Sequence, residues 1–286
     1  MTAPIFSFDV DGFTVTLVKC NTPVCGPFMG QKLHHPFNTR KVSKGKQTEL
    51  FYDDTFVDTK TSRLISETTR FDVKHDGSCG ALVWNSIEQK YMPFARFDIK
   101  KKDGIFKPPM ETVLKDGKNI QVELDTSCWI PCESKPTDDA ATHWPYLRPC
   151  HENKAMYRWY IKAFEDSQTF ISTMSPDIYG DIVTIEYMGP KFNGKVSDPI
   201  GKEAGIVLHG SLQMEIPREL RTPEGFKHIF QALPVIEGLV AYPPAFSSPM
   251  KIRAEMFEGL NWGKALPTVT KTYGHTGTGL SKEVLL

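Results

Sequence analysis

Residues 74–99 read KHDGSCGALVWNSIEQKYMPFARFDI. The parts from Ala81 to Ile87 and from Tyr91 to Ile99 are rich in β-branched and aromatic residues, which favour strands. The polar run Glu88-Gln89-Lys90 separates them, so this stretch predicts a β-hairpin. The run Lys74-His75-Asp76-Gly77 comes just before the first strand. It places a lysine, an acid and a glycine at the entrance to a predicted sheet.

The surrounding sequence predicts further strands and one helix. Residues 1 to about 70 alternate apolar and polar positions, as from Phe13 to Val18, which indicates strands and loops. A helix is predicted from Pro223 to Leu233, because Thr222 suits the N-cap and Pro223 the first helical position. Other strands are predicted at Tyr157 to Phe164, Ile182 to Met188, Val235 to Tyr242 and Met250 to Ala254.

These elements predict an α+β fold, with antiparallel sheets packed face to face and helices outside. Three regions are expected along the chain. Residues 1–60 form N-terminal strands and loops, residues 61–265 form a core, and residues 266–286 form a tail without a clear period. The core carries a loop-rich insert at 102–151, where proline, aspartate and lysine are frequent.

Composition narrows the class of protein. The 286 residues include 34 basic and 34 acidic side chains, so the chain as a whole has no charge that would attract polyanions. A nucleic-acid contact would need a local patch, for which Lys100-Lys101-Lys102 and the stretch from Arg40 to Lys46 are candidates. Such runs are also typical of solvated faces.

The cellular location is predicted from what the N-terminus and the apolar runs lack. The first residues carry no secretion signal, and the apolar runs are too short to span a membrane. We therefore expect an intracellular, cytoplasmic protein with no membrane partner. The six cysteines lack the paired spacing of a zinc site, and reduced thiols are expected in such a protein.

An ordered series of polar residues indicates chemistry. The Lys-x-Asp-Gly run is weak evidence alone, since a turn before a strand explains it equally well. Further charged residues follow it on predicted strands: Arg96, Glu186, Glu237, Lys251 and Arg253. Lys251 and Arg253 are two apart on a strand and should point to the same face.

This set suits nucleotidyl transfer to a lysine. A lysine attacks only as the neutral amine, so its pKa must fall, and nearby cations such as Lys251 and Arg253, with a bound metal, would favour that. The same cations would neutralise phosphate charge as it builds at the reacting phosphorus. Mg²⁺ takes one or two carboxylates with phosphate oxygens and water, and Glu237 could supply one.

The order of these residues resembles the motif series of covalent nucleotidyltransferases, the class of polynucleotide ligases and mRNA capping enzymes. Four further runs are similar to those of the eukaryotic RNA ligase 1 family, the ATP-dependent 5′-3′ RNA ligases. They are Cys128-Trp129-Ile130-Pro131, Glu186-Tyr187-Met188-Gly189-Pro190, His209-Gly210 and Glu237-Gly238-Leu239-Val240. The resemblance spans about Lys74 to Trp262.

The resemblance implies a nucleotidyltransferase, ATP-grasp-like fold and a reaction that uses ATP with Mg²⁺ or Mn²⁺ to join RNA ends. By position, the resemblance implies that Lys74 carries AMP and that Arg96 and Glu186 hold the ribose and its adjacent phosphate. It implies that Glu237 binds the metal and the nucleotide, and that Lys251 and Arg253 bind the nucleotide, with Lys251 at the α-phosphate. Asp72 and Val73 would lie near the adenine through their backbone.

One position departs from related enzymes. Cys79 stands where many DNA ligases and capping enzymes have an arginine, which leaves Arg96 as the expected substitute. Too little sequence follows Trp262 for an oligonucleotide-binding barrel, so RNA contact is expected from the core and its insert. The alternatives are a DNA ligase, a GTP-using capping enzyme and a noncatalytic RNA-binding protein of the same fold.

Overall fold

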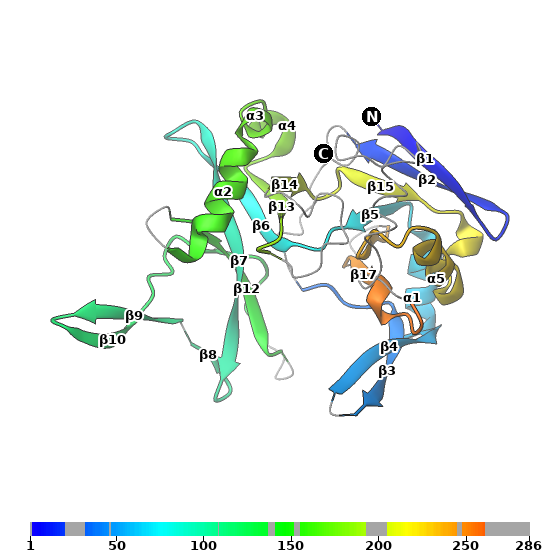
Figure 1. The fold of residues 1–286 in the computed structure, drawn as a ribbon, viewed down its shortest axis with the longest axis horizontal. Helices are drawn as coiled ribbons and strands as arrows, with labels where there is room; N and C mark the ends of the chain where they lie inside the picture. The colour runs from blue at the N-terminus through cyan, green and yellow to red at the C-terminus, as the bar shows by residue number, and fades with distance from the viewer. Residues whose placement is uncertain are drawn as a thin grey trace. The chain divides into compact units, whose positions relative to one another are not determined.

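The computed structural model describes residues 2–20, 32–45, 47–107, 109–136, 141–151, 155–192, 205–244 and 248–260 (Figure 1). These residues form two compact units. The first comprises the described parts of residues 1–24, 33–77 and 186–286, and the second those of residues 25–32 and 78–185. The predicted tail at 266–286 lies outside the described residues.

The first unit is built on a six-stranded sheet in which neighbouring strands run antiparallel. The strand order is β1 (Thr2–Val10), β2 (Phe13–Cys20), β15 (Leu212–Glu215), β5 (Arg70–Lys74), β16 (Gly238–Tyr242) and β17 (Met250–Arg253). The N-terminal strands therefore belong to the sheet that carries Lys74. A separate hairpin, β3 (Phe37–Lys44) with β4 (Gln47–Phe56), leads into helix α1 (Thr59–Glu67).

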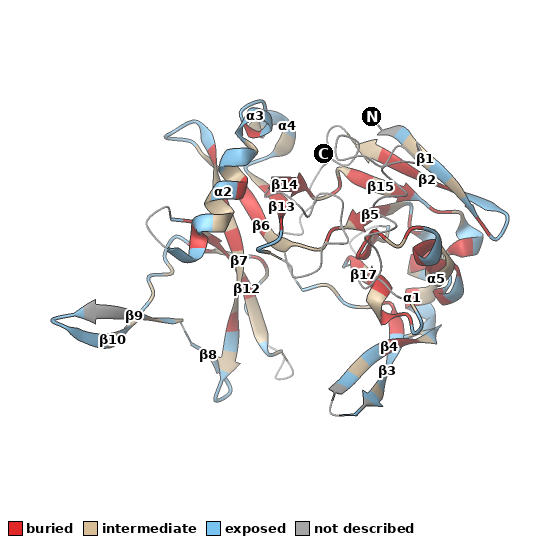
Figure 2. Cartoon of the chain, in the orientation of Figure 1, coloured by how far each residue is buried: buried red, intermediate tan, exposed pale blue. Residues whose placement is uncertain are grey.

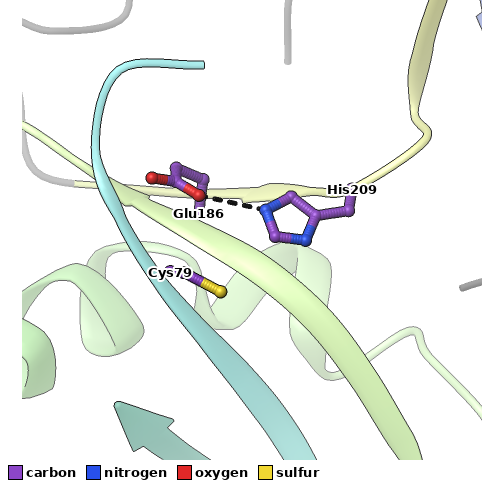
Figure 3. Close-up of side chains that lie close together, drawn as sticks. All are labelled: Cys79, Glu186 and His209. Carbon is purple, nitrogen blue, oxygen red and sulfur yellow. Dashed lines mark hydrogen bonds and ion pairs between the residues drawn. The ribbon is translucent and has the colours of Figure 1, made fainter. Parts of the chain in front are cut away.

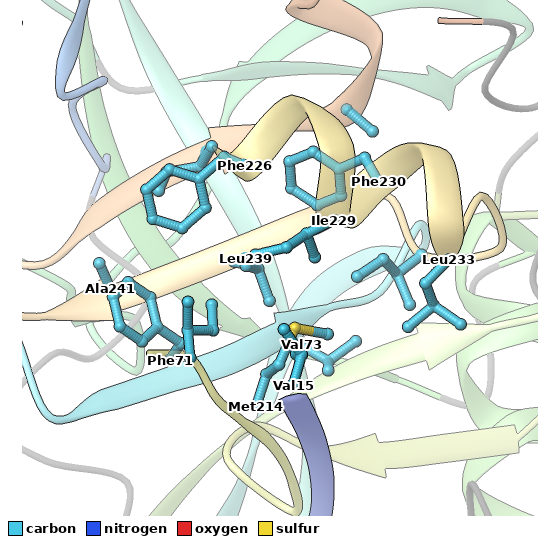
Figure 4. Packing of buried hydrophobic residues seen from close by; sticks show 14 of the residues in the cluster. Val15, Phe71, Val73, Met214, Phe226, Ile229, Phe230, Leu233, Leu239 and Ala241 are labelled. Carbon is cyan, nitrogen blue, oxygen red and sulfur yellow. The ribbon is translucent and has the colours of Figure 1, made fainter. Parts of the chain in front are cut away.

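Helix α5 (Pro223–Ala232) covers the apolar face of this sheet. The predicted start is confirmed, because the Thr222 hydroxyl accepts a hydrogen bond from the Gly225 N–H at 3.0 Å. Figure 4 shows the aromatic side chains Phe226 and Phe230 above the strands. They belong to a buried cluster that also includes Val15, Phe71, Val73, Met214, Ile229, Leu233, Leu239 and Ala241. Burial of this cluster holds β5 and β16 in place.

The second sheet confirms the hairpin predicted after Lys74. Strands β6 (Ser78–Asn85) and β7 (Lys90–Lys102) pair with Ala81 opposite Phe94. The full strand order is β11 (Ile130–Pro131), β12 (His143–Pro149), β7, β6, β13 (Ile182–Met188) and β14 (Gly205–Leu208), with β8 (Ile105–Phe106) pairing with β7.

The insert at 102–151 contains more strand than its composition indicates. Besides β8, β11 and β12 it includes the hairpin of β9 (Met110–Lys115) and β10 (Lys118–Glu123). Residues on β10 are exposed or half-buried, whereas buried residues predominate on β5 and β13 (Figure 2). The β9–β10 hairpin is thus a surface feature of the insert.

One predicted strand is wrong. Tyr157 to Phe164 falls in a 3-10 turn (Ala155–Tyr157) and in helix α2 (Arg158–Asp166), which the short helices α3 (Gln168–Ile171) and α4 (Pro176–Tyr179) follow. Tyr157, Tyr160 and Ile161 pack against the same buried cluster around Ala95. Their spacing of three and four residues is that of a helix face, which a count of aromatic residues overlooks.

Both units combine antiparallel strands with separate helices, which is compatible with the predicted α+β class. Within the part of the chain that the structure describes, no helix is long and apolar enough to cross a bilayer.

Candidate functional site

Strand β5 separates polar from apolar side chains along its length. Phe71 and Val73 are buried in the core against α5, and Arg70, Asp72 and Lys74 occupy the alternate positions. Successive side chains of a strand point to opposite faces, so these three polar residues share the other face. The sequence signal for this strand is the alternation of polar and apolar residues in Arg70-Phe71-Asp72-Val73-Lys74.

The sheet register extends this polar face onto β16 and β17. Lys74 lies opposite Gly238, which lies opposite Arg253. Two residues along each strand, Val240 lies opposite both Asp72 and Lys251. Directly opposed residues of an antiparallel sheet project from the same face. The two cations of the Lys-x-Arg run therefore share a face with Lys74.

Glu237 joins Lys74 to Arg253. Lys74 Nζ donates to one carboxylate oxygen of Glu237, and Arg253 Nε donates to the other at 3.2 Å. The Glu237 side chain is only 4% exposed, whereas that of Lys74 is 26% exposed. A second Arg253 nitrogen contacts Glu255 at 2.6 Å. A buried carboxylate thus holds two predicted site residues from different strands.

The pKa of Lys74 differs from the sequence expectation. Burial is the largest influence and lowers it, but the carboxylates of Glu237 and Glu186 together outweigh burial and Arg253, so the pKa is raised. The neighbouring cations alone therefore do not lower the pKa of Lys74, and the fall predicted with a bound metal beside them stays a prediction. Two acids next to Lys74 stabilise the ammonium form more than one nearby arginine destabilises it.

Glu186, on β13, is a further buried acid that acts on Lys74. Its carboxylate is within hydrogen-bond distance of the His209 ring, with 3.0 Å between Oε2 and Nε2 (Figure 3). The sequence left His209 without a role beyond its place in the resemblance. The structure makes it a neighbour of Glu186 and an electrostatic neighbour of Asp72.

Asp72 is held mainly by Arg70. Nε and one terminal nitrogen of the Arg70 guanidinium donate to the two carboxylate oxygens at 2.8 and 2.7 Å. The guanidinium carbon lies 4.4 Å from the Tyr242 ring centre. Burial raises the pKa of Asp72, while Arg70 opposes that shift. Val73 belongs to the apolar core. Contact of Asp72 and Val73 with adenine stays a prediction.

The other predicted residues are located by the strands that carry them. Arg96 is on β7 of the second unit, where its Nε donates to Asp98 at 3.0 Å. Cys79 is on β6, also in the second unit. Lys251 is placed by the register of β17 on the face of Lys74. The structure brings together Lys74, Glu237 and Arg253 by direct contacts, with Glu186 as an electrostatic neighbour.

Gly77 fits this site because it has no side chain. A Cβ at this position would lie 2.3 Å from the Tyr187 carbonyl oxygen and 2.7 Å from Glu186 Cγ. Both distances are too short for any real contact, so the β13 backbone that carries Glu186 passes directly beside the Lys-x-Asp-Gly run.

Gly77→Ala should therefore lower the free energy of unfolding by about 2–3 kcal/mol, since the clash involves backbone that cannot rotate away. Urea titration measures this loss. Gly205→Ala is the matched control, because a Cβ there would meet nothing within 4 Å, and it should change stability by less than about 0.5 kcal/mol. Equal stability of the two variants would contradict the close approach.

Comparison with known proteins adds no assignment. No protein-family model matches the chain, and no curated protein matches it.

Proposed function

We propose that this protein is an ATP-dependent RNA ligase with an ATP-grasp-like nucleotidyltransferase fold, in which Lys74 carries AMP as a covalent intermediate. One observation supports this above the others. Lys74 and Arg253 share the carboxylate of Glu237, although Glu237 lies 163 residues after Lys74. If Lys74 were only a turn residue and Arg253 only a charge on a solvent-facing strand, the two side chains would have no reason to meet at the same buried acid.

The residues of this face suit the stages of lysine adenylylation. The amine of Lys74 would attack the α-phosphorus, its proton would leave, and pyrophosphate would depart as the N–P bond forms. Lys251 and Arg253 would offset the negative charge that grows on the phosphate oxygens. AMP would then pass to the 5′-phosphate of one RNA end, and the 3′-hydroxyl of the other would displace it.

Because the pKa of Lys74 is raised, its ammonium group must lose a proton before the amine can attack. Glu237 and Glu186 hold the ammonium form, so the amine becomes nucleophilic only when their charge is offset by another cation. The buried carboxylate of Glu237 is the hard oxygen donor that Mg²⁺ or Mn²⁺ prefers, with Glu186 nearby. Such a metal, when bound, would neutralise carboxylate and phosphate charge together.

The choice of RNA ends rests on the family resemblance, because the residues of the polar face indicate only covalent nucleotidyl transfer. The same holds for Arg96 at the ribose and for the RNA contacts of the insert. A cytoplasmic location without a membrane partner is proposed on separate grounds, from the short apolar runs of the sequence. A DNA ligase would use the same lysine but join DNA ends. A capping-type enzyme would prefer GTP, and a noncatalytic RNA-binding protein would form no adduct.

Labelling with nucleotide separates these functions. The protein is incubated with Mg²⁺ and ATP or GTP labelled at the α-phosphate, denatured, and tested for retained label. We expect label from ATP alone, released by acid but stable to base, as for a phosphoramidate. The adduct is then given RNA or DNA with a 5′-phosphate and a 3′-hydroxyl, and joining of RNA is expected. The absence of any adduct would overturn the proposal.

A further inference from the structure

The outer edge of β17 is closed by residues from the N-terminal part of the chain. β17 is the last strand in its sheet, with β16 on one side. On the other side, the Lys251 N–H donates to the His34 carbonyl at 2.9 Å, and the Arg253 N–H donates to the Tyr52 hydroxyl at 3.2 Å. Residues 34 and 52 therefore accept the backbone N–H hydrogen bonds on the outer edge of β17, the strand that carries both predicted phosphate-binding cations.

Tyr52 is itself firmly held. It lies on β4 opposite Thr39, is 5% exposed, and makes edge contacts with the rings of Phe37 and Phe257 at 5.1 and 5.0 Å between centres. Its hydroxyl lies 2.6 Å from His35 Nδ1 and 3.4 Å from the Lys251 carbonyl. The packing of the Tyr52 ring fixes the position of its hydroxyl, and the hydroxyl in turn fixes the position of the β17 backbone that it contacts.

The charge of His35 determines whether its ring can accept a hydrogen bond from Tyr52. Burial, Lys251 and Arg253 lower the pKa of His35 to about 4, so its ring is neutral at pH 7. A neutral ring with its proton on Nε2 offers Nδ1 as an acceptor. The Tyr52 hydroxyl can then donate to His35 while it accepts from the Arg253 N–H. Such a chain strengthens each of its bonds.

We propose that Tyr52 and His35 are positioning residues for adenylyl transfer, which set the edge strand β17 so that Lys251 and Arg253 meet the phosphates. The proposal rests on the function proposed above. It assigns a role to N-terminal residues outside the span of the family resemblance. Small displacements of charged groups at a reacting phosphate lower the rate more than they lower the affinity for ground-state ATP.

Tyr52→Phe tests this role, with Tyr91→Phe as the matched control. Both changes remove one hydroxyl from a buried tyrosine; that of Tyr91 donates to the Gly180 carbonyl at 2.7 Å in the second unit. For Tyr52→Phe we expect the rate constant of adduct formation at saturating ATP to fall roughly tenfold, with less than about a twofold change in the half-saturating ATP concentration. Tyr91→Phe should leave both values within about twofold.

A structural readout keeps the two proposals separable. Hydrogen exchange at the amides of Lys251 and Arg253, followed without nucleotide, should quicken in Tyr52→Phe and not in Tyr91→Phe. Unchanged exchange, or equal adduct rates in the two variants, would overturn the positioning role. The absence of an adduct in the unaltered protein would instead overturn the proposed function, whatever exchange shows.

Discussion

Lys74→Arg should form no covalent nucleotide adduct at any ATP concentration. An arginine at this position can keep the cation that faces Glu237, but a guanidinium stays protonated and does not attack phosphorus. We expect adduct formation to fall by more than about 1,000-fold, to the background of the assay, because the nucleophile itself is removed. Retained label on the denatured protein, quantified by gel and by intact mass, measures the effect.

Two further variants serve as controls for this prediction. Lys74→Ala should also form no adduct, but it leaves Glu237 with one fewer partner and so can lower stability as well. Lys100→Ala removes an exposed lysine from the second unit and should retain the adduct within about twofold. Label that survives both Lys74 changes would show that another residue is the nucleophile and would refute the mechanism.

Glu237→Gln should lower adduct formation roughly 100-fold while it makes the Lys74 amine more reactive. The two effects have opposite causes. Glutamine removes the negative charge that raises the pKa of Lys74, so more of the neutral amine is present at a given pH. It also removes the carboxylate predicted to hold the metal, and it leaves Lys74 and Arg253 without their shared counter-charge.

Both effects of Glu237→Gln can be measured in one protein. ATP labelling follows adduct formation, and competitive modification by an amine reagent at pH 8, read by peptide mass spectrometry, follows the reactivity of Lys74. Glu255→Gln is the matched control, since Glu255 pairs with Arg253 through a different guanidinium nitrogen from the one that faces Glu237. It should leave labelling within about threefold. Faster adduct formation in Glu237→Gln would mean that Glu237 merely restrains the lysine.

Local sequence signals predicted elements whose stability is decided within a few residues. The helix at α5 was predicted at its observed start, because the Thr222 cap and Pro223 act on the first turn alone. The strand from Ile182 to Met188 was predicted with its observed ends. The interpretation of Tyr157 to Phe164 failed, because aromatic residues suit helices and strands alike when they are packed against a core.

Local signals of this kind do not predict which strands pair when they are far apart in the sequence. The sequence predicts strands and loops in residues 1–60 but not their partners. In the structure β1 and β2 share a sheet with β5, and Tyr52 lies beside Arg253, 201 residues away. Which strands become neighbours depends on how all apolar faces are buried together, and no window of sequence contains that information. The alternation in Arg70 to Lys74 gave the face of each side chain but not the strands beside it.

The sequence by itself determined the chemical groups at the candidate site: a lysine in a Lys-x-Asp-Gly run, two acids and two cations. It also determined, through the period of a strand, that Lys251 and Arg253 point to one face. Only the tertiary structure decided the state of Lys74. Its pKa is raised because folding buries Glu237 and Glu186 beside it, and charges so close in a poorly hydrated site interact far more strongly than sequence spacing can indicate.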